Sequence, residues 1–243
     1  MDNYWKGKTI CFLGDSITEG VGVVPGERYF DFLSKELGFT ACGYGVNGAR
    51  YVDLYEQALR MKKEFGSNTD AIFIFAGTND FFLNTPPGEW FNYAEEDVAA
   101  LKNDDGTPLK IETRKVRQFN FDTDTYKGSI NRLMSFLKHN YAEKQIFMLT
   151  PLHRAYAEFG PLNIQYSEMY SNSLGIFFDE YVNAIREAAQ IWAAELIDMY
   201  SISGLYPLYD ESAGKYFCHI DTDRLHPNKE GHKKIAEILK RKI

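Results

Sequence analysis

Short apolar runs alternate with segments of helical spacing along most of this chain. The runs have the length of buried strands and are too short for buried helices. Such an alternation is typical of βαβ units, in which helices cover both faces of a parallel sheet. We therefore predict an α/β fold, a three-layer α/β/α sandwich around a central five-stranded parallel sheet. The predicted strands are residues 9–13, 40–45, 71–75, 145–149 and 195–199.

Between these strands, apolar residues recur at helical spacing, so each segment would lay one apolar stripe on the sheet. The last segment runs from Asn228 to the C-terminus and has Lys240, Arg241 and Lys242 in its final turn, where positive charge suits the helix dipole. We predict five helices on this basis. Their stripes are Phe30, Leu33 and Leu37; Leu54, Ala58, Met61 and Phe65; Ile130, Leu133, Met134 and Leu137; Tyr181, Ile185, Ala188 and Trp192; and Ile235, Ile238 and Leu239.

Two stretches interrupt the alternation, at residues 81–127 and 153–171. The first is far longer than an ordinary βα connection and contains the turn signal Asp105-Gly106, so we expect a hairpin or a short helix of its own there. Both insertions would rise from the carboxyl edge of the sheet and form the walls of a pocket. Because no linker or internal repeat divides the chain, we predict one domain over residues 1–243.

Charge and composition narrow the classes of function. The 243 residues carry a net charge of −7, with Lys and Arg scattered along the chain. Nucleic acids and anionic membrane surfaces bind basic faces, so we expect neither as a partner. No run approaches the roughly 18 apolar residues of a membrane span, and the first strand begins too early to leave room for a signal peptide. We therefore expect a cytoplasmic protein; the pattern leaves its oligomeric state open.

Residues suited to acyl transfer stand where the predicted strands end. The carboxyl ends of parallel strands share one edge, and open α/β sheets bind their ligands there. A fourth block of such residues precedes the last predicted helix. The blocks are Gly14-Asp15-Ser16-Ile17-Thr18, Gly45-Val46-Asn47-Gly48, Gly77-Thr78-Asn79-Asp80 and Asp223-Arg224-Leu225-His226-Pro227-Asn228.

These blocks resemble the GDSL/SGNH hydrolase family, in which a Ser, a Gly, an Asn and a His follow one another in this order. The matching residues are Ser16, Gly48, Asn79 and His226, with Asp223 three positions before the histidine. The resemblance implies a flavodoxin-like fold and an esterase or acylhydrolase that forms an acyl-enzyme on Ser16. It implies a catalytic triad of Ser16, His226 and Asp223. It also implies an oxyanion hole made of the backbone N–H groups of Ser16 and Gly48 and the side-chain amide of Asn79.

The block near the C-terminus supports this assignment on physical grounds. A serine hydroxyl is a poor nucleophile until a base takes its proton, and the base needs a third group to fix its tautomer. At a separation of three residues, one turn of backbone brings the Asp223 carboxylate to Nδ1 of His226 and leaves Nε2 free to face Ser16. Pro227 favours extended backbone at the histidine, and Asn228 can cap the helix that follows. We expect the histidine on a stiffened loop just before that helix.

The expected oxyanion donors also have physical reasons. Negative charge develops on the carbonyl oxygen during attack and must meet donors that are already in place. Glycine at position 48 lets the main chain approach the substrate closely, and Asn79 is a neutral donor where a carboxylate would repel the oxyanion. Asp15 and Asp80, by contrast, are expected to be structural, the first as an acceptor for loop N–H groups and the second as a turn residue.

Other histidines and acids offer alternatives to this triad. Of the five histidines, His226 has an aspartate at the right spacing before an extended Pro-Asn pair. Asp221 could reach the imidazole if the loop curls differently, although the family spacing favours Asp223. His232 lies one helical turn further on, and we expect it on the surface of the last helix.

Functions from two other classes compete with hydrolysis. The segment 43–48 matches the G-x-G-x-x-G dinucleotide fingerprint, but it lies on the second βα unit, and Asp70 precedes the third strand instead of ending it. A non-catalytic carbohydrate-binding domain is disfavoured because all five expected residue types are present. The chain lacks H-E-x-x-H, paired cysteines and a P-loop, so we predict neither a metal nor a cofactor.

The resemblance fixes a reaction class and leaves the substrate open, since family members cleave acetyl groups from sugars, fatty acyl chains from lipids, and thioesters. The anionic charge and the lack of a long apolar stretch favour short acyl esters, such as O-acetyl esters of carbohydrates. A lipid acylhydrolase, a lysophospholipase or a thioesterase is the alternative within the family. The expected partner is a small-molecule or carbohydrate ester.

Overall fold

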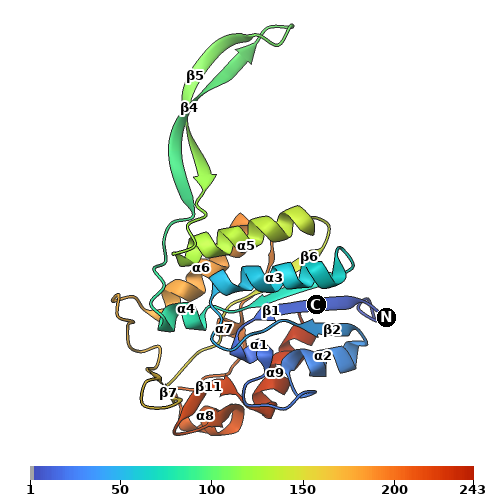
Figure 1. The fold of residues 1–243 in the computed structure, drawn as a ribbon, viewed down its shortest axis with the longest axis vertical. Coiled ribbons are helices and arrows are strands. Elements are labelled where there is room, and N and C mark those ends of the chain that lie inside the picture. The colour runs from blue at the N-terminus through green and yellow to red at the C-terminus, as the bar shows by residue number, and fades with distance from the viewer. Residues whose placement is uncertain (1–2) are drawn as a thin grey trace.

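The computed structural model describes residues 3–243 and places a parallel sheet between two layers of helices (Figure 1). The five strands follow the order β2-β1-β3-β6-β9, and every neighbouring pair is parallel. The predicted α/β fold is therefore confirmed. Two strands match the prediction, β1 is one residue longer, and β2 and β9 each end two residues earlier. The strands are β1 Thr9–Gly14, β2 Thr40–Gly43, β3 Ala71–Phe75, β6 Gln145–Leu149 and β9 Glu195–Ile197.

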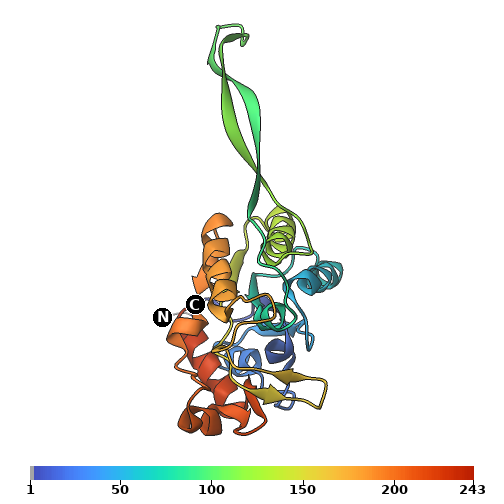
Figure 2. The same ribbon diagram turned by 90° about the vertical axis from the view of Figure 1, so that its left-hand side faces the viewer.

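Different helices cover the two faces of the sheet. Alternate strand residues point to opposite sides, so both faces carry apolar side chains that need to be covered. Cys11 and Leu13 of β1 pack toward α3, α5 and α6, whereas Ile10 and Phe12 pack toward α2 and α9 (Figures 1 and 2). All five predicted helices are present. Within residues 3–243, none of the helices combines the length and the apolar character needed to cross a bilayer. The helices are α2 Tyr29–Leu37, α3 Tyr51–Phe65, α5 Tyr126–Asn140, α6 Phe178–Ile191 and α9 Lys229–Lys240.

A second, smaller sheet was not predicted. Its order is β10-β11-β7-β8, with antiparallel pairs, and it lies near the carboxyl edge of the main sheet. The insertion 153–171 contributes two of its strands, so this stretch is partly regular. Four short helices occupy the remaining connections. These elements are β7 Ala157–Glu158, β8 Ile164–Gln165, β10 Phe217–His219, β11 Asp223–Pro227, α1 Ser16–Glu19, α4 Thr78–Phe82, α7 Met199–Ile202 and α8 Asp210–Tyr216.

The longer insertion forms the predicted hairpin, of β4 Phe91–Lys102 and β5 Pro108–Phe119. Figures 1 and 2 show this two-stranded ribbon standing away from the rest of the chain. Asn131 of α5 holds its base, because the side-chain amide donates to the carbonyl oxygens of Trp90 at 2.9 Å and Asn120 at 2.8 Å. The hairpin therefore leaves from the helix layer. The predicted wall of a pocket is formed by the start of the insertion 81–127, at Phe82 and Leu83, and not by the hairpin.

Candidate active site

Ser16 follows directly from the first strand of the sheet. β1 ends at Gly14, and the Asp15 carboxylate caps α1 by accepting the N–H of Ile17 at 3.0 Å. The turn has no room for a side chain at position 14, since a Cβ there would lie 2.2 Å from the Thr18 hydroxyl oxygen. Asp15 is a structural acceptor, as expected, although its donor lies in the first turn of α1 and not in a loop. Burial raises the pKa of its carboxyl to about 6. The tight turn leaves Ser16 only 3% exposed.

Gln57 fixes the end of β1, and the sequence did not single it out. From α3, its side-chain oxygen accepts the N–H of Gly14 at 2.9 Å, and its side-chain amide donates to the carbonyl oxygen of Gly14 at 2.8 Å. Gln57 is 1% exposed. The available signal was its position beside Leu54 and Ala58 on the apolar face of the helix, where an amide needs a partner.

His226 and Asp223 lie on β11, so the predicted loop is in fact a strand. Asp223 pairs in register with Ala157 of β7, and Pro227 pairs with Phe217 of β10. The Asp223 carboxylate lies 3.0 Å from Nδ1 of His226 and also accepts the backbone N–H of His226 at 3.0 Å. As the extended backbone passes into α9, the Asn228 side chain caps this helix as predicted.

The structure brings Ser16 and His226 together from opposite ends of the chain. Nε2 of His226 lies 3.0 Å from the Ser16 hydroxyl oxygen, while Nδ1 faces Asp223. Within the described residues, no hydrogen bond joins the competing Asp221 to this imidazole; the backbone N–H of Asp221 donates to Nδ1 of His219. The serine, the histidine and Asp223 thus form one continuous hydrogen-bonded chain. This is the arrangement that lets a base accept the proton of a serine hydroxyl.

Gly48 and Asn79 line the same cavity as Ser16 and His226. Gly48 has a φ of +77°, and a Cβ there would meet nothing within 4 Å. The backbone conformation at position 48 therefore favours glycine by itself, and the expected close approach to the substrate stays a prediction. Across the described residues, no acceptor takes the N–H groups of Ser16 or Gly48. The Asn79 amide donates one hydrogen to the carbonyl oxygen of Ala49 at 3.0 Å, which leaves its other hydrogen unused.

Asp80 joins the two loops that carry these donors. Its buried carboxyl accepts the N–H of Tyr51, the first residue of α3, at 3.0 Å and 3.3 Å. Burial raises the pKa of this carboxyl to about 8. Asp80 is thus an anchor between α4 and α3 and not a simple turn residue. It also occupies the helix N-terminus that the fingerprint at 43–48 would offer to a pyrophosphate, which argues against nucleotide binding.

We call the cavity around Ser16 the catalytic pocket; its volume is about 340 Å³. The insertion 153–171 supplies part of its wall, as predicted, whereas Phe82 and Leu83 are its only residues from 81–127. Over residues 3–243, no group of three or more His, Cys, Asp or Glu is placed to hold a metal ion. The catalytic pocket is lined by Ser16, Val21, Asn47, Gly48, Asn79, Phe82, Leu83, Phe159, Asn163, Gln165, Leu225 and His226.

Comparison with known families agrees with this geometry. The model of the GDSL-like Lipase/Acylhydrolase family matches residues 10–239, which is nearly the whole chain and includes every residue of the serine-histidine-aspartate chain. The chain belongs to this family. It is therefore an acylhydrolase, an enzyme that acts on ester bonds.

Solved structures agree on the fold of this GDSL-like acylhydrolase. A Lactobacillus plantarum protein is 21% identical with a TM-score of 0.72, over 97% of this chain and 96% of that one. A lipase/acylhydrolase from Enterococcus faecalis is 17% identical with a TM-score of 0.56, over 97% and 95%. An acetyl xylan esterase is 21% identical with a TM-score of 0.61, over 97% and 99%. Comparison with curated proteins gives no match.

His232 of this acylhydrolase lies in the core, so the predicted place on the helix surface is wrong. Its Nδ1 accepts the backbone N–H of Tyr29 at 3.1 Å, and the two rings stack with an interplanar angle of 2°. The Tyr29 hydroxyl in turn lies 3.1 Å from the hydroxyl of Thr18 in α1. Burial lowers the pKa of His232 to about 4. A neutral His232 therefore links α9 and α2 to the short helix that begins with Ser16.

Proposed function

We propose that this acylhydrolase cleaves short-chain carboxylic esters through an acyl-enzyme on Ser16. One observation carries the proposal: the His226 imidazole lies 3.0 Å from the serine hydroxyl on one side and 3.0 Å from the Asp223 carboxylate on the other. A single ring is thus in reach of both the group that it must deprotonate and the group that fixes its tautomer.

In the first half of the proposed reaction, Ser16 Oγ attacks the ester carbon while Nε2 of His226 takes the hydroxyl proton. Asp223 stabilises the imidazolium that forms. Breakdown of the tetrahedral intermediate expels the alcohol, which receives the proton from His226. In the second half, His226 takes a proton from water, the resulting nucleophile attacks the acyl-enzyme, and Ser16 leaves with the proton restored.

The oxyanion of each tetrahedral intermediate would be stabilised by three donors, the N–H groups of Ser16 and Gly48 and the free amide hydrogen of Asn79. All three residues line the catalytic pocket. The contact from Asn79 to the Ala49 carbonyl orients this amide before substrate arrives. Donors that are fixed in advance do not have to reorganise as the charge develops.

Four amide side chains in the catalytic pocket favour a polar ester, such as an O-acetyl ester of a carbohydrate. They are those of Asn47, Asn79, Asn163 and Gln165. Gln165 is bonded to Arg154 and Asn163, whereas Asn47, Asn79 and Asn163 keep amide hydrogens without a partner among the described residues. A lipid chain would bury these hydrogens without replacing their bonds to water, whereas sugar hydroxyls can bond to them. A structural neighbour of this chain is described as an acetyl xylan esterase, which is consistent with this substrate class.

Replacing Ser16 by alanine tests the reaction. We expect Ser16→Ala to abolish hydrolysis of 4-nitrophenyl acetate and labelling by a fluorophosphonate probe, with an unchanged thermal midpoint. Ser67→Ala is the matched control, because Ser67 is exposed in the loop after α3 and should retain both signals. Retained hydrolysis in Ser16→Ala would rule out the nucleophile. In a substrate panel, acetylated sugars should be cleaved faster than lysophospholipids and long-chain aryl esters, and the opposite order would refute the substrate class.

A further inference from the structure

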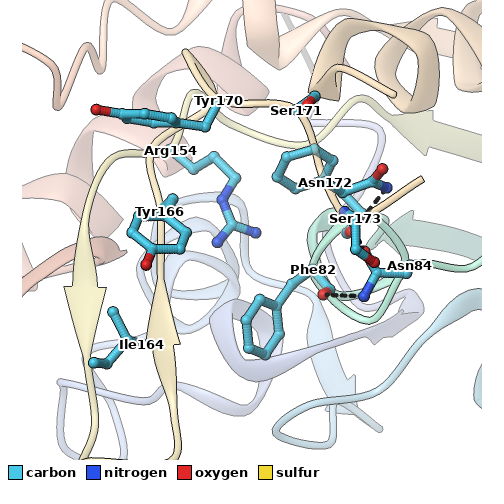
Figure 3. A pocket seen from close by; sticks show the side chains of 10 residues that line it. Phe82, Asn84, Arg154, Ile164, Tyr166, Tyr170, Ser171, Asn172 and Ser173 are labelled. Atoms are coloured by element: carbon cyan, nitrogen blue, oxygen red, sulfur yellow. Dashed lines mark hydrogen bonds between the residues drawn. The ribbon is translucent and has the colours of Figure 1, made fainter. Parts of the chain in front are cut away.

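A second cavity of about 350 Å³ lies beside the catalytic pocket (Figure 3). We call it the aromatic pocket, for Phe81, Phe82, Tyr166 and Tyr170, which line it together with Ile164 and Arg154. Phe82 also lines the catalytic pocket. On β8, Ile164 faces the aromatic pocket, while the next residue, Gln165, faces the catalytic one. The two cavities are therefore neighbours that share a wall at Phe82.

The Arg154 guanidinium forms the floor of the aromatic pocket. It is 1% exposed, and Figure 3 shows it directed into the space between Phe82 and Tyr166. One of its terminal nitrogens donates to the carbonyl and hydroxyl oxygens of Thr78, each at 3.0 Å, and the other donates to Gln165 at 2.7 Å. Its Nε–H is buried and has no hydrogen-bond partner among residues 3–243. Burial lowers the pKa of the group to about 10, which leaves it charged at neutral pH.

The Arg154 charge lacks the direct counter-ion that the other shielded arginines have. Arg28, Arg50, Arg186 and Arg224 are half-buried, and each forms a salt bridge with an aspartate. Arg154 is more deeply buried, yet no carboxylate of the described residues lies within salt-bridge distance of its guanidinium; the carboxylates of Glu168 and Asp15 stabilise its charge from further away. A buried charge is costly unless it is paired. The aromatic pocket is thus suited to a ligand that brings an anion.

The walls of the aromatic pocket are suited to a ring. Tyr166 is 63% exposed and Tyr170 is 62% exposed, and their ring centroids lie 5.6 Å apart. The two amides in the lining are already engaged: Asn84 bonds to Phe82 and Ser173, and Asn172 bonds to backbone groups and a tyrosine hydroxyl. Exposed side chains change rotamer freely, so the tyrosine rings can turn to admit a ligand and then pack on it.

We propose that the aromatic pocket binds a carboxylate-bearing ring, with the rings of Tyr166 and Tyr170 against its face and the Nε–H of Arg154 on its carboxylate. In combination with the proposed function, the short acyl group lies at Ser16 and this ring belongs to the alcohol part of the ester. Two classes of compound contain a ring that bears a carboxylate: acidic sugars and aromatic acids. The pocket thereby selects esters whose alcohol part is anionic.

Binding to Ser16→Ala protein tests the pocket without any reaction. The probes are two matched pairs, benzoate with benzamide and galacturonate with galactose, each titrated by ligand-observed NMR. A charge-assisted hydrogen bond predicts that the carboxylate of at least one pair binds about 10- to 100-fold more tightly than its neutral partner. The pair that shows this preference identifies the source of the ring. Equal affinities within both pairs, or no binding by any probe, would overturn the proposal.

Two variants locate the binding. Tyr166→Ala should weaken binding of the preferred carboxylate about fivefold or more, because it removes the ring wall. The matched control is Tyr209→Ala, since Tyr209 is 71% exposed and lies outside the pocket. Equal weakening in both variants would contradict the assignment. Arg154→Gln, if its circular dichroism is native, should abolish the preference; a retained preference would exclude Arg154.

These results are independent of the proposed reaction. If Ser16→Ala still hydrolyses 4-nitrophenyl acetate, the reaction scheme fails, but the titrations still measure whether the aromatic pocket prefers a carboxylate. If the reaction scheme holds and the titrations show no carboxylate preference, the pocket assignment alone fails.

Discussion

Replacing Gln57 by methionine should displace Ser16 without changing a residue that lines the catalytic pocket. Methionine keeps the length of the side chain and removes both hydrogen bonds to Gly14, which lies two residues before Ser16. The Gly14 carbonyl keeps a second donor, the N–H of Val46 at 3.2 Å. The Gly14 N–H, by contrast, would be left unpaired beside a buried sulfur.

The size of this effect follows from those contacts. An unpaired buried N–H costs about 1–3 kcal/mol, and the lost bond to the carbonyl adds about 0.5–1.5 kcal/mol. The free energy of unfolding should therefore fall by about 2–4 kcal/mol, which for a chain of this length lowers the thermal midpoint by roughly 5–15 °C. Because small displacements of reacting groups are costly, kcat for 4-nitrophenyl acetate should fall by about 10- to 100-fold.

Calorimetry and steady-state kinetics measure the two effects, with Gln190→Met as the control. Gln190 also lies on a helix, but it is exposed, so the same substitution there should change neither the midpoint nor kcat. Equal midpoints for the two variants would show that the Gly14 contacts contribute nothing. A midpoint that falls while kcat stays constant would show that they stabilise the fold without positioning Ser16.

Three further predictions concern the oxyanion donors, pH and the hairpin. Asn79→Ala should reduce kcat for 4-nitrophenyl acetate by about 10²–10³ with little change in KM, since the contact forms in the transition state; an effect confined to KM would make Asn79 a substrate-binding residue. Burial raises the pKa of Asp80 from 3.8 to about 8, so the folded state holds this proton more tightly and loses stability as pH rises between these values. Asp80→Asn cannot ionise, so the difference between its thermal midpoint and that of the wild type should shift in favour of the variant from pH 5 to pH 8. A difference that is constant with pH would mean that the pKa of the Asp80 carboxyl is not raised. Replacing residues 92–118 by an Asn-Gly turn between the paired Phe91 and Phe119 should leave kcat/KM within about twofold, because no residue of that segment lines the catalytic pocket; a tenfold loss would show that the hairpin supports the site.

The centre of the main sheet was predictable because its inner strands β1, β3 and β6 are buried on both faces. Residues 71–75 and 146–149 are continuous apolar runs, and β3 and β6 have the predicted bounds. The helices followed from stripes that must face that sheet. The candidate site residues were found through the family resemblance, since a Ser, a Gly, an Asn and a His follow one another in the family's order, each at a predicted strand end or before a predicted helix.

The smaller sheet was not predictable from local pattern. β7 and β8 have two residues each, which is too short for any periodicity, and β11 contains the polar residues Asp223, Arg224 and His226. Its existence depends on pairing between Ala157 and Asp223, which are far apart in sequence. The prediction that His232 lies on the helix surface failed for a related reason. A histidine one turn from the helix start looks solvated until a distant N–H, that of Tyr29, is placed against it.

The residues that hold the site together differ in kind from the residues that the sequence identified. Gln57 fixes Gly14, Asp80 fixes Tyr51, and β7 pairs with the strand of His226, and each of these contacts spans a long stretch of chain. None of the three has a reactive role, so no chemical motif reveals it. Each nevertheless determines where a hydroxyl, an N–H or an imidazole lies. Substitutions at these anchors should therefore lower kcat more than they raise KM, because they displace groups that act on the transition state while the walls that contact the bound ester stay in place.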